Sequence, residues 1–219
     1  MSKVLIVGGG AAGMFASIFA AKNGNEVHVF EKNEKLGKKL FITGKGRCNI
    51  TNACDMEGLF DAVRTNAKFL YSSFYGYTNQ QVIDFFERIG VPTKIERGDR
   101  VFPVSDHSSD VIATLRKALA NKNVEVFLHT KVNHLLVTKE QIKGVGLSDG
   151  REVPADAVIV ATGGFSYQTT GATGDGYRFA EKTGHKLVQR TPALVPFEIK
   201  EAWVKELQGL SLKNVELRI

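Results

Sequence analysis

The spacing of hydrophobic residues changes twice within the first thirty positions. Residues 4–7 form a short apolar run rich in β-branched side chains, which is typical of a strand buried on both faces. Small and apolar residues then favour a helix at 11–22, and an Asn-Gly pair follows it. At 26–30 polar and apolar residues alternate, which predicts a second strand. The chain therefore begins as a β-α-β unit.

The rest of the chain alternates between helical and extended patterns. Helices are predicted at 57–74, at 78–89, at about 110–121 and from the glycine-rich turn at 173–176 onward. Extended segments are predicted at 124–132, at 132–155 as antiparallel strands with turns at 139–140 and 149–150, and at 156–164 as a buried parallel strand. In the helices predicted at 57–74 and 78–89, the expected core positions are Leu59, Val63, Leu70, Val82, Phe85, Phe86 and Ile89. We also expect the aromatic-rich stretch 66–77 to pack in the core.

Three glycines stand at the junction of the first strand and the first helix. Gly8, Gly10 and Gly13 form a GxGxxG pattern. The first permits a tight turn, the second lets a pyrophosphate approach the backbone, and the third brings the helix close to the strand. The helix then starts at Ala11 and Ala12, whose free N–H groups carry a partial positive charge. This arrangement predicts a dinucleotide site.

An acidic residue ends the second strand. Glu31 lies 18 residues after Gly13, close to the roughly 20 expected for the acid that binds a ribose hydroxyl. A carboxylate at this place favours a ribose with a free 2′-hydroxyl over one with a 2′-phosphate. It does not distinguish FAD from NAD.

A later strand ends in a second group of small residues, Ala161, Thr162, Gly163 and Gly164. We expect this strand to return beside the first glycine turn. Such a place is a topological switch point, where an open α/β sheet binds its ligand. The predicted fold class is therefore a Rossmann-like α/β domain with an antiparallel β insertion.

Residues 43–52, TGKGRCNITN, have no apolar face at either helical or strand spacing. Two glycines, two cations, a cysteine and two asparagines occupy seven of the ten positions. A denser group of basic residues surrounds the segment, at Lys32, Lys35, Lys38, Lys39, Lys45 and Arg47. This group is read either as a solvated face or as a partner for phosphate.

Composition limits the class of protein. The 219 residues are 43% hydrophobic and 24% charged, with a formal net charge of +6, which is typical of a globular chain with one domain, or one and part of another. The positive charge suits phosphate-bearing ligands. No concentrated basic stripe with interleaved aromatic residues is present, so a nucleic-acid partner is not favoured.

Only two cysteines occur, Cys48 and Cys54. Their spacing suits neither a disulfide framework nor a zinc site, so we expect a reducing, cytoplasmic setting and no metal. No secretory leader and no apolar run long enough to span a membrane is recognisable, and no membrane partner is expected. Of the histidines, His28 and His129 fall within strand patterns, while His107 and His185 are the candidates for a site.

Several motifs together resemble a known group. The GxGxxG–Glu31 unit, "KLGKKLFITGKGRCNITN", "DRVFPVSD" and "ATGGFSYQTTGATGDGYRFAEKTGH" resemble the bacterial BaiN-like or aminoacetone-oxidase-like NAD(P)/FAD-dependent flavoproteins over nearly the whole chain. The "ATGG…TGDG" pair also resembles the fumarate reductase flavoprotein group. The resemblance implies FAD bound in an extended form across a two-dinucleotide-binding-type fold.

The resemblance also implies roles for further residues. Residues 43–52 would lie beside the flavin and its phosphates, and a valine-type position would face the adenine through its backbone. The implied cofactor-binding residues beyond the glycine turns and Glu31 are Lys32, Lys39, Thr43, Gly46, Arg47, Cys48, Asn49, Val132 and Asp175. Cys48 is read either as packed near the ring or as redox-active. Asp175 is read either as a ligand of a flavin or ribityl hydroxyl or as a helix cap.

Members of this group are longer than 219 residues. We therefore expect 1–190 to be the N-terminal part of the FAD-binding domain and 191–219 the beginning of an inserted, mainly β substrate domain, with the boundary near "RTPALVPF". The expected function is an FAD-dependent oxidoreductase acting on a small molecule, with NAD(P)H as a possible reductant and with no catalytic residue assigned. The alternatives are an RNA-modifying flavoprotein and an inactive nucleotide-binding fragment.

Overall fold

The computed structural model describes residues 1–219 except 121–122, 193, 196–197, 211, 213–214 and 217–219. The chain divides into two compact units, Met1–Lys186 and Leu187–Ile219. In the described part of the second unit the regular structure is one 3₁₀ turn, η4 at Ala202–Lys205. Part of the predicted boundary "RTPALVPF", namely Ala193, Pro196 and Phe197, lies outside the described residues. That 191–219 begin an inserted domain stays a prediction.

A four-stranded parallel sheet forms the centre of the first unit. Its strands are β1 (Lys3–Val7), β2 (Glu26–Phe30), β6 (Val124–Phe127) and β10 (Ala157–Val160), in the order β10-β1-β2-β6. The chain moves outward from β1 through β2 to β6 and then returns on the other side of β1. The predicted switch point between β1 and β10 is therefore confirmed.

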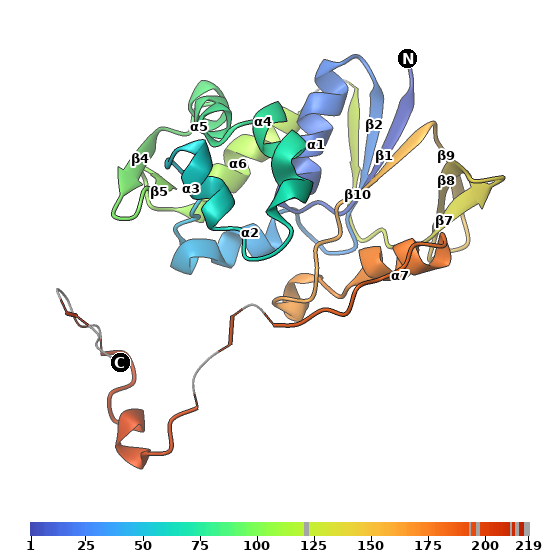
Figure 1. Cartoon of the computed structure of the whole chain (residues 1–219). Helices are drawn as coiled ribbons and strands as arrows, with labels where there is room; N and C mark the ends of the chain where they lie inside the picture. Colours follow the sequence, from blue (N-terminus) through green and yellow to red (C-terminus); the bar gives the residue numbers. More distant parts are fainter. Residues whose placement is uncertain (121–122, 193, 196–197, 211, 213–214, 217–219) are drawn as a thin grey trace. The chain divides into compact units, whose positions relative to one another are not determined.

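Strand β1, in the middle of the central sheet, is covered on both faces. Its consecutive side chains point to opposite sides of the sheet. Val4 and Ile6 pack with Ala21 and its neighbours on helix α1 (Ala11–Lys22). Leu5 and Val7 pack with apolar residues of a second sheet and of helix α7 (Asp175–Lys182). Figure 1 shows α1 on one side of the parallel sheet and the strands β7–β9 on the other.

The second sheet is the predicted antiparallel insertion. Its strands β7 (Val132–Thr138), β8 (Gln141–Leu147) and β9 (Glu152–Pro154) follow in chain order. The turn between β7 and β8 falls at Lys139 and Glu140, which both adopt positive φ, of 49° and 63°. Positive φ at both central residues is the geometry of a type I′ hairpin turn, so the predicted turn is confirmed.

The residues between β2 and β6 build a separate layer of short elements. Its helices are α2 (Lys38–Ile42), η1 (Thr43–Gly46), α3 (Met56–Asp61), η2 (Ala67–Leu70), α4 (Tyr71–Gly76), α5 (Asn79–Arg88) and α6 (Ser108–Leu119). A small antiparallel sheet, with the order β3-β5-β4, joins β3 (Thr51–Asn52), β5 (Arg100–Pro103) and β4 (Thr93–Glu96). The predicted last residue of the helix at 110–121, Asn121, lies outside the described residues.

The single helix predicted at 57–74 is wrong. The segment is divided into α3, η2 and α4, and Asn66 in the left-handed conformation (φ 54°) precedes η2. Core packing of the aromatic stretch is also wrong in part, because Phe69, Tyr71 and Tyr75 are 79%, 58% and 53% exposed. Tyr71 and Tyr75 pack instead against Phe60 and each other at the surface. Local aromatic contacts thus replace burial.

The single strand predicted at 124–132 is wrong as well. It ends at Phe127, and His129 adopts a left-handed conformation (φ 51°) in the turn that follows. Val132 therefore begins another strand in a different sheet. His129, predicted within a strand, lies in this turn.

Candidate functional site

The first glycine turn is sterically closed on the protein side and open on the other. A Cβ on Gly8 would lie 2.5 Å from the carbonyl oxygen of Ala161, and a Cβ on Gly13 would lie 1.8 Å from that of Gly8. A Cβ on Gly10 would meet no atom of the described chain within 4 Å. The first two glycines therefore let backbone segments pass in contact, whereas Gly10 faces open space.

Helix α1 begins at this turn without a capping side chain. Gly10 is its N-cap, and the first helical bond runs from the N–H of Met14 to the carbonyl of Gly10, at 2.9 Å. The N–H groups of Ala11, Ala12 and Gly13 precede that bond and have no acceptor within the helix. They carry the positive end of the helix dipole, which favours a bound anion.

A cavity of about 660 Å³ opens at the carboxyl ends of β1 and β10. The predicted site residues that line it are Gly8, Gly10, Ala11, Ala12, Glu31, Lys32, Lys39, Thr43, Val132, Ala161, Thr162, Gly163 and Asp175. Residues that sequence reasoning missed also line it, among them Asn33, Lys38, Thr130, Lys131, Thr170, Gly171 and Tyr177. Asn33 and Lys131 each lie within two positions of a predicted site residue. Their nearness in sequence to those residues could have indicated that they line the same cavity.

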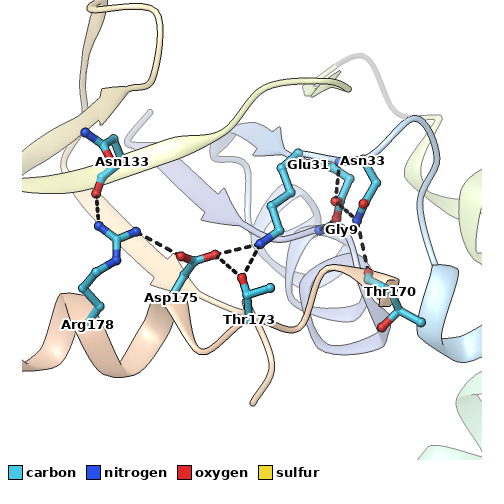
Figure 2. A network of polar contacts seen from close by, with 9 residues as sticks. Gly9, Glu31, Asn33, Asn133, Thr170, Thr173, Asp175 and Arg178 are labelled. Carbon is cyan, nitrogen blue, oxygen red and sulfur yellow. Dashed lines mark hydrogen bonds and ion pairs between the residues drawn. The ribbon is translucent and has the colours of Figure 1, made fainter. Parts of the chain in front are cut away.

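Glu31 lies at the end of β2 and is 7% exposed. One carboxylate oxygen accepts from the N–H of Gly9 at 2.7 Å. The other accepts from the backbone N–H and the side-chain amide of Asn33, at 2.8 and 2.6 Å (Figure 2). A carboxylate has about four acceptor positions. Glu31 is therefore held in place by three donors and keeps room for about one more.

Asp175 is the centre of an ion-pair network beside Glu31 (Figure 2). One of its oxygens accepts from Lys32 Nζ at 2.8 Å, and the same ammonium donates to the Thr173 hydroxyl at 2.7 Å. The other oxygen accepts from Arg178 at 3.0 Å, and Arg178 also donates to the carbonyl of Asn133 at 2.8 Å. Burial raises the pKa of Asp175, but the bonds from Lys32 and Arg178 outweigh it and lower the pKa to about 2. The carboxylate is charged, and its network joins α7 to β7 and to the segment that follows β2.

Val132 lines the cavity at the start of β7 and is 4% exposed. It pairs with Leu147, and the neighbouring ladder bond runs from the N–H of Ser148 to the carbonyl of Lys131 at 2.9 Å. Hydrogen-bonded and non-hydrogen-bonded pairs alternate in an antiparallel ladder. Val132 therefore occupies a non-hydrogen-bonded position, and its N–H points away from β8.

Arg47 is held away from the lining of the cavity. Its guanidinium donates to Asp106 at 2.9 Å and to Glu96, and lies 4.1 Å from the centre of the Phe102 ring. Lys94 joins the same group through Asp106 at 2.5 Å. The bonds to Glu96 and Asp106 raise the pKa of Arg47. This cluster ties the 43–52 segment to β4 and to the turn after β5.

Two more side chains of the segment, those of Cys48 and Asn49, are also held within the protein, whereas Thr43 lines the cavity. Cys48 is 1% exposed in a hydrophobic cluster, and burial raises the pKa of its thiol. The Asn49 amide donates to the carbonyls of Thr51 and Val101. The predicted site residues outside the lining are Gly13, Gly46, Arg47, Cys48, Asn49 and Gly164. Their contact with a cofactor stays a prediction.

The two candidate histidines, His107 and His185, do not line the cavity either. Among the residues that the structure describes, no three His, Cys, Asp or Glu side chains gather so that they could hold a metal ion. Within the same residues, the helices are all too short or too polar to cross a membrane.

Known proteins match this chain over most of its length. The model of the HI0933-like protein Rossmann domain matches residues 2–216. The 3-dehydro-bile acid delta(4,6)-reductase of Clostridium scindens is 36% identical over 206 residues, which are 92% of this chain and 48% of that protein. The ribosomal RNA dihydrouridine synthase of Escherichia coli is 30% identical over 94% of this chain and 50% of its own length. The chain thus spans about half the length of the curated relatives it matches.

Solved structures share the fold. A flavocytochrome c3 fumarate reductase in an open conformation superposes with a TM-score of 0.59 at 23% identity, over 84% of this chain and 40% of that one. The Rossmann-type arrangement, with a parallel sheet and added antiparallel strands, is common to both.

Proposed function

The chain belongs to the HI0933-like family with a Rossmann domain, and from this membership we propose that it binds FAD and serves an oxidoreductase. The observation that carries the proposal is a single cavity of about 660 Å³ that joins the uncapped start of α1, Glu31, Val132 and the loop after β10. Its volume lies within the range of cofactor sites.

Three features of the cavity support a place for the adenosine half of FAD. The N–H groups at Ala11 and Ala12, beside the open position at Gly10, suit the pyrophosphate. The remaining acceptor position of Glu31 suits a ribose hydroxyl. The N–H of Val132, which the β7–β8 ladder does not use, suits the adenine edge.

The flavin half is assigned to Lys39, Thr43 and Ala161 to Gly163, which also line the cavity. Bound flavin supplies hydride or electron transfer to and from a small molecule, for which NAD(P)H is the proposed reductant. The chain's own residues bind and orient the cofactor and neutralise its phosphates. We assign no proton transfer to any of them.

The cofactor proposal is tested by denaturing the purified protein and identifying the released nucleotide. FAD is expected. Release of NAD without any flavin would contradict the proposal and leave a nicotinamide site in its place.

A second candidate is an activity on RNA. Two relatives at 30% identity are ribosomal RNA dihydrouridine synthases, and the exposed rings of Phe69, Tyr71 and Tyr75 lie in one segment with the exposed Arg64 and Lys68. Exposed aromatic and basic side chains are what single-stranded nucleic acid binds. The test is the affinity of the protein for an RNA oligonucleotide. An affinity that decreases steeply with salt, and that the substitution Tyr71→Ala lowers, would favour this candidate over the first.

The proposal also includes a cellular location and a division into domains. We propose a cytoplasmic setting, because Cys48 and Cys54 are free thiols. We also propose that 1–190 form the cofactor domain and that 191–219 lead into a second one.

A further inference from the structure

The end of β2 carries two opposite signals for a nucleotide. Glu31 is the acid that suits a free 2′-hydroxyl, whereas the next residue, Lys32, is a cation beside the same position. A cation at the end of this strand is what accommodates a 2′-phosphate. Both residues line the cavity. The local sequence by itself is therefore ambiguous about the 2′ group.

A residue 143 positions later removes the ambiguity. The ammonium of Lys32 is bonded to the carboxylate of Asp175 at 2.8 Å and to the hydroxyl of Thr173 at 2.7 Å. The side chains of Lys32 and Asp175 are only 25% and 14% exposed. Their mutual attraction is therefore less screened than that of a surface pair. Asp175 is in turn held by Arg178 from the same helix, at 3.0 Å.

We propose that Asp175 is a specificity-determining residue, which holds Lys32 and so makes the cavity reject a 2′-phosphorylated adenosine ribose. The inference rests on the proposed nucleotide site. A 2′-phosphate would meet the charge of Glu31 and a second carboxylate at Asp175, which already neutralises the charge of the nearby ammonium. Removing the charge of Asp175 frees that ammonium to bind the phosphate.

The alternative role for the network is purely structural. Asp175, Arg178 and Asn133 join α7 to β7, and loss of that contact would disturb every nucleotide equally. The two roles therefore differ in one quantity, the ratio of affinities for two ligands that differ only in the 2′ group.

The test is calorimetric titration of the purified protein, after its bound nucleotide has been removed, with ADP-ribose and with 2′-phospho-ADP-ribose. The wild type is expected to bind ADP-ribose and to discriminate against the phosphorylated form. Asp175→Asn keeps the shape of the side chain and should improve the affinity ratio for the phosphorylated form by about tenfold or more, since an ionic hydrogen bond becomes available to it. Adding Lys32→Met to that variant should abolish the gain.

The matched control is Asp149→Asn. Asp149 is an exposed carboxylate paired with Arg151 in the turn between β8 and β9, outside the cavity lining. This change removes the same charge from the whole protein and should leave the ratio unaltered.

An unchanged ratio in Asp175→Asn, or a gain that survives Lys32→Met, would overturn the inference and leave the proposed function standing. A wild type that binds neither probe would overturn both.

Discussion

Two loops that the sequence assigns to one ligand satisfy their polar groups in different ways. The turn from Gly8 to Gly13 offers backbone N–H groups that no residue of α1 accepts from. The segment 43–52 offers side chains, and the protein itself binds them, as Arg47 with Asp106 and Asn49 with Val101 show. A glycine turn stays available because it has no side chain to be captured, whereas long polar side chains find partners from distant parts of the chain.

The start of helix α5 differs from the start of helix α1. Its N-terminus is closed by a capping box, in which the Thr78 hydroxyl accepts from the N–H of Gln81 and the Gln81 side chain accepts from that of Thr78. Such a cap satisfies the first-turn donors with the helix's own residues. Helix α1 has Gly10 at the same position, and no capping side chain accepts from its first-turn donors.

The largest effect is expected from Gly13→Ala. The new methyl group would lie 1.8 Å from the carbonyl oxygen of Gly8, which is backbone and has little freedom to move. We expect a loss of about 3 kcal/mol or more in the free energy of unfolding, measured with urea. Gly10→Ala is the matched control, because its methyl group meets open space. It should unfold like the wild type, and equal stability of all three proteins would show that α1 is not packed tightly on β1.

The next effect is expected from Val132→Pro. Proline lacks the N–H that we assign to the adenine edge, and a strand tolerates it at its first residue. FAD binding should be abolished, as measured by flavin fluorescence, while the fold survives. Val132→Ile should bind FAD nearly as the wild type does. Full occupancy in the proline variant would remove the Val132 backbone from the site.

A smaller loss is expected from Glu31→Gln. The amide keeps the shape of the side chain but loses a charge-assisted bond worth roughly 1.5–3 kcal/mol, so the affinity for FAD should fall by about tenfold or more. Asn33→Ala removes one of the donors that hold Glu31 and should have a smaller effect on the same titration. An unchanged affinity in Glu31→Gln would exclude a bond to the ribose.

The smallest effect on binding is expected from Arg47→Met. Since Arg47 bonds to Glu96 and Asp106, its loss should speed amide hydrogen exchange across 43–52 and lower FAD affinity less than Glu31→Gln does. Unchanged exchange together with a large loss of affinity would instead indicate a direct contact with the cofactor.

The same cluster predicts a dependence on pH. Bonds from Arg47 lower the pKa of Glu96, and bonds from Lys94 and Arg47 lower that of Asp106. Carboxyls with lowered pKa stabilise the fold fully above their ordinary pKa values of 4.5 and 3.8 and lose that contribution as pH falls through the lowered ones. Protection factors for 43–52 should therefore be constant above pH 4.5 and decline below it in the wild type. The decline should be weaker in Arg47→Met, and a parallel decline in both proteins would exclude the cluster as its cause.

The sequence alone determined the first β-α-β unit, the glycine turn, the position of Glu31, the antiparallel insertion and the switch point. These features depend on the period of apolar side chains and on the sterics of a few neighbouring residues, so a short stretch is enough to specify them. They also account for part of the cavity lining, including Ala161 to Gly163 after the returning strand.

Tertiary structure decided the rest. It broke the helix expected at 57–74, ended the strand at Phe127, turned the N–H of Val132 away from β8, and bound Arg47 and Lys32 to partners. Asp106 is 59 positions from Arg47, and Asp175 is 143 positions from Lys32. A charge in the sequence shows only that a partner is needed. Which partner satisfies it depends on the distances that folding creates between residues far apart in the chain.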